Sequence, residues 1–133
     1  MDEIAVHVET EIHLTESEEK VKKAVANLFS DLSTEITPSY QGSVLKAEAK
    51  GREALVTFRN LLRLDRIRDA ARKALFGGLR DNTIRFCLNK QVAFAGHVSF
   101  SEEVAESPLG PIRVTIECAE PRQLIDWLAA RTA

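Results

Sequence analysis

The chain has 133 residues, of which 44% are hydrophobic and 29% are charged, and its formal net charge is −2. These values exclude an intrinsically disordered chain and predict a single domain over residues 1–133, built around one core. The longest run without a charged residue is 91–101, far shorter than the ~20 apolar residues that cross a bilayer, so no membrane partner is expected. The amino terminus lacks the pattern of a secretory signal, and a cytoplasmic location is the default expectation.

The distribution of charge along the chain is uneven. Residues 1–35 carry 3 Lys and Arg against 9 Asp and Glu, residues 36–100 carry 12 against 5, and residues 101–133 carry 3 against 6. The three segments therefore have net charges of −6, +7 and −3. A basic middle segment between two acidic ends indicates a polyanionic partner.

The first predicted elements are a strand and a helix. Residues 4–14 alternate apolar and polar side chains, which predicts a strand with one buried face. Thr15 and Glu18 have the spacing of a capping box, in which each side chain satisfies a backbone N–H at the start of a helix. Apolar residues follow at helical spacing, so we expect a helix over residues 16–32.

A loop and a second strand are predicted next. Residues 36–43 contain Pro38 and Gly42 and are expected to form the loop. Residues 44–50 alternate again, with small residues on one side and lysines on the other. Outward lysines discourage further strand pairing, so this strand is expected at an edge of the sheet.

Residues 52–76 are predicted to be helical, with a break near Asp65 as an alternative in which Asp65 is an N-cap. If the helix is continuous, its apolar residues gather on one side and a stripe of basic residues lies about 120° away. This basic stripe consists of Arg52, Arg59, Arg63, Arg66 and Lys73. Arg68 and Arg72 fall outside it and are expected to pair with Asp65 and Asp69.

A β-hairpin is predicted over residues 83–100, because their apolar side chains keep to even-numbered positions. A three-residue turn at 89–91 would place Phe86 opposite Phe94 and keep both apolar faces together. Lys90 would then lie at the exposed tip of the hairpin.

The carboxyl-terminal part is predicted to contain an acidic connection over residues 101–111, a last strand over 112–118 and a last helix. Pro121 can occupy the first position of that helix, with Trp127 on its buried side. The order of elements predicts an α+β fold with a mixed, mainly antiparallel sheet and helices packed on one face.

The motifs of the common enzyme classes are missing from the sequence. It has no phosphate-binding glycine loop, nucleophile-elbow serine, paired Cys-x-x-Cys or His-Glu-x-x-His helix. We therefore expect no catalytic residues, no cofactor and no metal, and predict that the protein is not an enzyme. His7 and His13 would lie roughly 20 Å apart on their strand, too far to share a metal ion, and His7 with Glu9 is more simply an exposed strand face.

Basic side chains are the candidate RNA-binding residues. They are Arg59, Arg63, Arg66, Lys73 and Lys90. The first four belong to the basic stripe and could neutralise several phosphates, which would make binding strongly salt-dependent. For Lys90 the sequence leaves a phosphate contact open, although a simple turn at Asn89 is favoured.

The outward face of the sheet is expected to lack aromatic side chains. Its predicted positions include residues of the first strands and also Ala93, Ala95 and His97 of the expected hairpin. Base stacking on the sheet, as in the common RNA-recognition module, is therefore not expected. If RNA binds, backbone and shape recognition is predicted.

Several stretches together resemble the Uncharacterised Protein Family 0201. They are LLRLDRI at residues 61–67, LNKQVA at 88–93, PLGPI at 108–112 and IDWLA at 125–129. The family consists of small archaeal proteins described as predicted RNA-binding or exosome-associated subunits. The resemblance covers nearly the whole chain and implies a fold like that of large-subunit ribosomal protein five. It implies no catalytic residues, because none are established for the family.

Two functions from different classes follow. The first is a non-enzymatic RNA-binding accessory protein that uses its basic helix. The alternative is a protein-interaction or assembly module, which could be a homodimer, whose basic helix meets an acidic surface.

Overall fold

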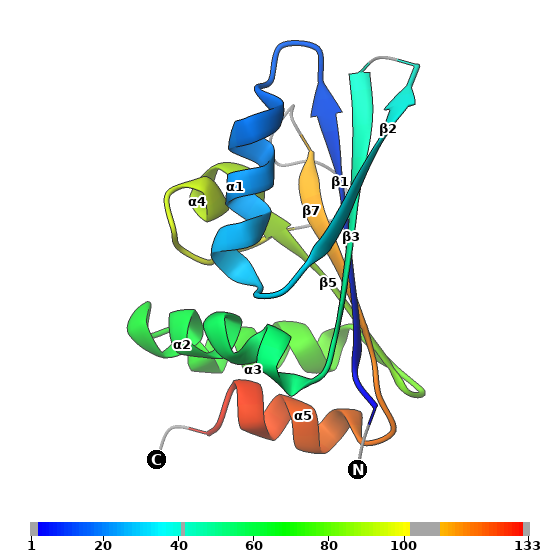
Figure 1. The fold of residues 1–133 in the computed structure, drawn as a ribbon. Helices are drawn as coiled ribbons and strands as arrows, with labels where there is room; N and C mark the ends of the chain where they lie inside the picture. The colour runs from blue at the N-terminus through cyan, green and yellow to red at the C-terminus, as the bar shows by residue number, and fades with distance from the viewer. Residues whose placement is uncertain (1–2, 41, 102–109, 132–133) are drawn as a thin grey trace.

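The structure is a computed structural model that describes residues 3–40, 42–101 and 110–131 (Figure 1). Its strands are β1 (Ala5–His13), β2 (Ser33–Ser39), β3 (Gly42–Lys50), β4 (Leu79–Arg80), β5 (Thr83–Asn89), β6 (Phe100–Ser101) and β7 (Pro111–Glu117). Its helices are α1 (Glu18–Leu28), the 3-10 turn η1 (Arg52–Leu55), α2 (Val56–Leu64), α3 (Arg68–Gly77), α4 (Lys90–Phe94) and α5 (Pro121–Leu128).

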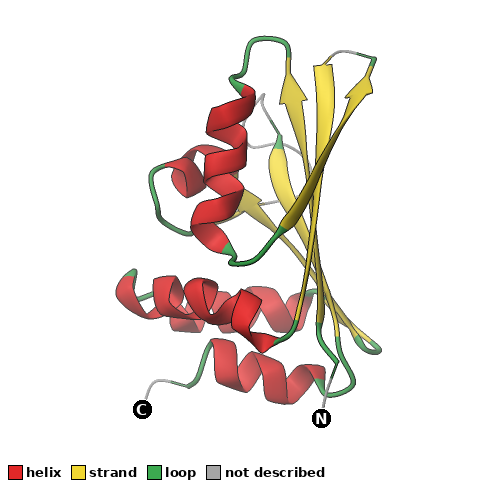
Figure 2. Ribbon diagram, viewed as in Figure 1, coloured by secondary structure: helices red, strands yellow, loops and turns green. Residues whose placement is uncertain are grey.

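The strands form one sheet in the order β2-β3-β1-β7-β5-β4, and β6 pairs with β5. Each pairing is antiparallel. The helices lie on one face of the sheet, with α1 and α4 over one half and α2, α3 and α5 over the other (Figures 1 and 2). The predicted α+β fold with helices on one face is confirmed, and its sheet is antiparallel throughout the described residues.

The central strands form because their alternating residues bury one face. Val6, Val8 and Ile12 of β1 point into the core, as do Val114 and Ile116 of β7. Burying a side chain of this size stabilises the fold by roughly 1.5–3 kcal/mol. The first predicted strand is therefore confirmed, as is the last one.

A cluster of phenylalanines joins the helices to the sheet. The ring centroid of Phe58 on α2 lies 5.2 Å from that of Phe29 and 5.6 Å from that of Phe86 on β5. Phe86 in turn lies 5.8 Å from Phe100. Aromatic pairs at these separations add about 0.5–1.5 kcal/mol beyond the area they bury. This cluster fixes α2, and with it the candidate interface, on the sheet.

The start of α1 differs from the capping box that was predicted. The N-cap is Ser17, whose hydroxyl accepts a hydrogen bond from the Lys20 amide, and not Thr15. The helix also ends earlier than predicted, because Phe29 is already extended and the Ser30 amide donates to the Ala54 carbonyl.

The predicted loop at 36–43 is wrong, because the end of β2 and the start of β3 occupy most of it. Ile36 pairs with Leu45 and Pro38 with Ser43 across the antiparallel β2–β3 ladder. β2 is therefore the edge strand, and β3, predicted at the edge, lies between β2 and β1. Pro38 is tolerated because an edge strand leaves half of its amides unpaired.

The predicted hairpin with a turn at 89–91 is also wrong. β5 ends at Asn89, whose side chain accepts a hydrogen bond from the Val92 amide at 2.9 Å and caps α4. β5 pairs instead with β7, and only briefly with β6. The even-numbered apolar pattern continues through α4 by coincidence. A single helical turn is too short to distinguish the two-residue period of a strand from the 3.6-residue period of a helix.

Most of the predicted acidic connection, residues 102–109, lies outside the described residues. The last helix is confirmed, with Pro121 in its first turn and Leu124, Ile125 and Leu128 buried. No helix in the described ranges is both long and apolar enough to cross a bilayer.

Candidate nucleic-acid interface

The helix predicted over 52–76 is broken at residues 65–67, the alternative left open by the sequence. The Ile67 amide donates to the Leu62 carbonyl and the Arg66 amide to the Arg63 carbonyl. This pair of bonds is a Schellman motif, which ends a helix at a residue in the left-handed conformation. That residue is Arg66, with φ 56°. Glycine usually fills this position, because a Cβ costs roughly 1–2 kcal/mol there.

Asp65 points away from the basic residues on both sides of it. Its carboxylate accepts a hydrogen bond from the Val98 amide at 3.0 Å and lies 2.9 Å from Nδ1 of His97. Burial raises the pKa of this carboxyl, but the hydrogen bonds with His97 and Val98 lower it by more. The pKa of Asp65 therefore lies below the ordinary value. The predicted N-cap role and the predicted pairing with Arg68 are therefore wrong. Asp65 ties the α2–α3 turn to the chain after α4.

Three basic residues of the predicted stripe and candidate set are exposed on α2, α3 and the turn between them. Arg63 and Arg66 lie at the end of α2, and Lys73 lies on α3. None of them takes part in the ion pairs between described residues. We call Arg63, Arg66 and Lys73 the exposed basic surface. Because α2 and α3 are separate helices, the single stripe calculated for one continuous helix does not exist.

Arg59 and Arg72 bind the carboxyl-terminal helix. Nε of Arg59 donates to the Trp127 carbonyl at 2.8 Å, and Nη1 of Arg72 donates to the Ala129 carbonyl at 3.2 Å. Nη1 of Arg72 also lies 2.6 Å from Oδ1 of Asp126. α5 has no basic residue in its own last turn, so the two arginines satisfy carbonyls that carry the negative end of its dipole.

Aromatic rings complete this contact. The guanidinium carbons of Arg52 and Arg59 each lie 5.1 Å from the Trp127 ring centroid, and that of Arg72 lies 5.0 Å from Phe76. Such cation–π contacts contribute about 0.5–1 kcal/mol at exposed sites. We call this arrangement the α5 seam. The bond from Arg72 to Asp126 was not predicted from the sequence.

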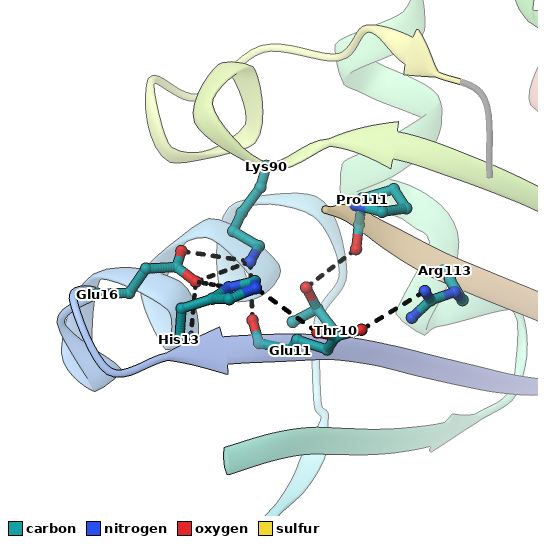
Figure 3. A network of polar contacts seen from close by, with 7 residues as sticks. All are labelled: Thr10, Glu11, His13, Glu16, Lys90, Pro111 and Arg113. Atoms are coloured by element: carbon teal, nitrogen blue, oxygen red, sulfur yellow. Dashed lines mark hydrogen bonds and ion pairs between the residues drawn. The ribbon is translucent and has the colours of Figure 1, made fainter. Parts of the chain in front are cut away.

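Lys90 is buried and does not lie at an exposed tip (Figure 3). Its side chain is 4% exposed, and Nζ donates to the Glu11 carbonyl at 2.7 Å. Nζ also lies 3.1 and 3.2 Å from the two carboxylate oxygens of Glu16. Oε1 of Glu16 accepts a further hydrogen bond from the His13 amide at 2.9 Å. Lys90 thus anchors α4 to the end of β1 and the start of α1.

The same contacts determine the pKa of Glu16. Burial raises the pKa of its carboxyl, but the hydrogen bonds from His13 and from Lys90 lower it by more, so that the pKa falls below the ordinary value. Glu16 is therefore ionised at neutral pH and balances the buried ammonium group.

The outward face of the sheet carries charged and polar side chains. His7 on β1 lies 3.2 Å from Glu48 on β3 and 3.9 Å from Glu117 on β7, on the exposed strand face that the sequence favoured for it. Ala93, Ala95 and His97, predicted on this face, belong instead to α4 and the loop after it, on the helical side. Ala93 is buried.

The α5 seam was not predicted from the sequence. Arg59 and Trp127 are 68 residues apart, and no local pattern pairs them. The only usable signal is the seven-residue spacing of Arg52 and Arg59, which places both on one helix face toward a common neighbour. The cap of α4 had a clearer signal, since asparagine is among the preferred N-cap residues.

A family model described as "RNA binding" matches residues 5–118. A UPF0201 protein of Sulfurisphaera tokodaii is 45% identical over 126 residues, which cover 95% of this chain and 87% of that protein. A UPF0201 protein of Pyrobaculum islandicum is 43% identical over 123 residues, 92% of this chain and 86% of that protein. This chain belongs to the UPF0201 family.

Solved structures of the family share its fold. A crystal structure of an uncharacterised UPF0201 protein superposes with a TM-score of 0.84 at 33% identity, covering 96% of this chain and 94% of that one. The 2.2 Å crystal structure of the UPF0201 protein from Methanococcus jannaschii gives a TM-score of 0.84 at 31% identity, covering 97% and 95%. The resemblance to this family that the sequence indicated is confirmed, whereas the implied likeness to large-subunit ribosomal protein five stays a prediction.

Proposed function

We propose that this UPF0201 protein is a non-enzymatic RNA-binding accessory protein that holds phosphates with the exposed basic surface. The observation that carries the proposal is Arg66. An arginine occupies the left-handed position of an exposed turn, where glycine would be less strained. Strained backbone conformations of this kind gather at functional sites, so the Arg66 guanidinium is a candidate to bind an anionic ligand.

The charges around the turn support an anionic ligand. Arg63 and Arg66 are exposed, and the nearest acid in sequence, Asp65, is directed toward His97 and Val98. Guanidinium groups match phosphate oxygens with paired N–H donors. Since the described outward positions of β1, β3, β5 and β7 carry no aromatic residue, the sheet offers no base-stacking platform, and contact with the RNA backbone is favoured.

The other two candidates contribute differently. Arg59 is half-buried and its Nε is held by Trp127, so it adds charge near the surface without directing that donor outward. Lys90 is buried beside Glu16, and we leave it out of the interface. Exosome association and a cytoplasmic location stay predictions of the sequence.

Titration of a fluorescently labelled RNA hairpin at several salt concentrations tests the proposal. Changing Arg63 and Arg66 together to Gln removes two phosphate contacts, so the slope of log affinity against log salt should fall by about 2. The matched control is Lys46→Gln, which removes an exposed charge from the opposite face of the sheet and should leave binding unchanged. A wild-type protein that binds no RNA at low salt, or a double variant that binds as tightly as wild type, contradicts the proposal.

An assembly module is the second candidate. It is favoured by the outward sheet face, which no described helix covers, and by the exposed edge strand β2. A partner recovered equally well from nuclease-treated and untreated extract would favour this function. Light scattering of the purified protein would then separate a homodimer from a complex with another protein.

A further inference from the structure

A cleft of about 350 Å³ lies between α1 and α4. Its floor contains the buried side chains of Val21 and Ala24, and its rim includes Lys20, Gln91 and Phe94. Glu16 and Lys90 also line it, and their charges balance each other. The volume falls at the lower end of the range of small-molecule sites in proteins.

Phe94 is exposed, whereas three of the six phenylalanines of the chain are buried and the other two are partly buried. The side chain is 40% exposed and does not belong to the hydrophobic core, whereas Phe29 and Phe58 are fully enclosed. Nζ of Lys20 and Nζ of Lys23 lie 5.8 and 5.7 Å from the Phe94 ring centroid. Both ammonium groups lie over the ring, so a base that stacks on Phe94 would take their place on the ring face while they stay within reach of its phosphates.

The short helix that presents Phe94 is fixed at both ends. At its start Asn89 caps the helix and Lys90 is bonded to Glu16 and to the Glu11 carbonyl. At its end Nδ2 of Asn27, on α1, donates to the carbonyls of Ala93 at 3.0 Å and Phe94 at 3.3 Å. A helix of five residues has little stability alone, so these bonds hold the ring in place before any ligand arrives.

We propose that the cleft between α1 and α4 binds one unpaired RNA base, which stacks on Phe94 while Lys20 and Lys23 neutralise the adjoining phosphates. The base enters edge-first over Val21 and Ala24, and the amide of Gln91 meets its polar edge. This inference rests on the proposed function and deepens it, because it assigns single-stranded RNA as the preferred substrate.

The cleft and the exposed basic surface are parts of one face. Asp65, in the turn that holds Arg66, bonds to His97 and Val98, which follow α4 by three and four residues. Both α4 and the α2–α3 turn lie on the helical side of the sheet (Figure 1). One strand of RNA can therefore contact Arg66 with its backbone and place a neighbouring base on Phe94.

Two labelled RNAs of equal length test the inference, one a hairpin with an unpaired loop and the other a blunt duplex. Phe94→Ala should weaken binding of the hairpin by about tenfold or more, the expected effect of losing one stacked base. Binding of the duplex should not change, because it offers no free base. Phe94→Tyr keeps a flat ring and should bind the hairpin as wild type does.

Matched variants separate stacking from general effects. Tyr40→Ala removes another exposed aromatic ring, 97% exposed at the end of β2, and should bind both RNAs normally. Lys23→Gln should weaken hairpin binding, whereas Lys22→Gln, which removes the partner of Glu18 on the same helix, should not. Phe94→Leu preserves apolar volume and serves if the alanine variant unfolds, with the same loss of hairpin binding expected.

A hairpin with 5-iodouracil in its loop gives a direct readout, since irradiation should cross-link the base to the peptide containing Phe94. Equal hairpin binding by wild type, Phe94→Ala and Phe94→Leu, with RNA binding otherwise intact, overturns the inference and leaves the proposed function standing. Equal losses for hairpin and duplex also overturn it. A wild-type protein that binds neither RNA contradicts both the inference and the proposed function. Loss of a protein partner in the Phe94→Ala variant would also overturn the inference, because the cleft would then bind a protein.

Discussion

At the α5 seam, Arg59 and Arg72 lie half-buried, with their guanidinium groups against helix carbonyls, a carboxylate and aromatic rings. At the α2–α3 turn, a few residues away in sequence, Arg63 and Arg66 are exposed and take part in no ion pair with a described residue. The two regions have the same side-chain chemistry and belong to the same basic segment.

The difference between the two regions is set by an element far along the chain. α5 packs against one part of the basic segment, and its backbone carbonyls accept hydrogen bonds from the arginines there. Arg63 and Arg66, at the α2–α3 turn, have no such contact with α5 among the described residues. A count of basic residues therefore overstates the surface available to RNA. Lys90 is the extreme case, because a lysine in the basic middle segment is buried beside Glu16.

Lys90→Ala is expected to give the largest effect. It leaves the Glu16 carboxylate buried without its main counter-charge, and breaking a buried pair from one side costs about 3–5 kcal/mol. Urea denaturation should show this loss. The double variant Lys90→Met with Glu16→Gln should recover much of it. A fall of less than about 1 kcal/mol in the free energy of unfolding would mean that the Lys90–Glu16 pair contributes no more than a solvent-exposed ion pair.

Arg72→Gln should destabilise the protein by about 1–2 kcal/mol, through loss of the bonds to Asp126 and Ala129. Lys73→Gln, one residue away and exposed, should change the free energy of unfolding by less than about 0.5 kcal/mol. RNA affinity should show the reverse order. Equal stability effects for the two variants would remove the distinction between seam and exposed surface.

Arg66→Gly should stabilise the protein by about 0.5–1 kcal/mol while weakening RNA binding. The gain is expected because glycine relieves the left-handed conformation, and the weaker binding because a phosphate contact is lost. Thermal unfolding and RNA titration of the same variant measure both. A destabilised variant would show that the Arg66 side chain supports the fold, and would weaken the case for its function.

The smallest expected effect concerns Asp65 and acid. Its pKa is lowered in the folded protein, so its contribution to stability is complete above the unfolded value near 3.8 and is lost as the pH falls through the folded pKa. Asp65→Asn should flatten the fall in stability between neutral pH and pH 3, measured by urea denaturation. An unchanged acid profile would show that the Val98 and His97 bonds are not coupled to protonation.

Local patterns in the sequence were sufficient for the central strands and for the presence of α1, and they left the break at Asp65 open as an alternative. Alternation in β1 and β7 reflects a single buried face, and a period of two is hard to mistake over seven or more residues. The same reasoning failed for β2, because an edge strand with one half-buried residue, Ile36, and a proline has almost no pattern to read.

The candidate site was less accessible to sequence reasoning. Arg63, Arg66 and Lys73 were identified, but Lys90 was placed at an exposed tip because the parity of Val92 and Phe94 imitated a strand. The exposure of Phe94 could not be foreseen, since it depends on Asn27 of α1 holding the end of α4 across 66 residues. Long-range hydrogen bonds of this kind leave no local signature.

The RNA-binding family model ends at residue 118, whereas α5 begins at Pro121. The helix that receives Arg59 and Arg72 thus lies after the residues that this family model matches. The carbonyls of Trp127 and Ala129 accept hydrogen bonds from these two arginines, and the carboxylate of Asp126 pairs with Arg72. α5 thus acts as an internal ligand for Arg59 and Arg72, which an external anion would have to displace.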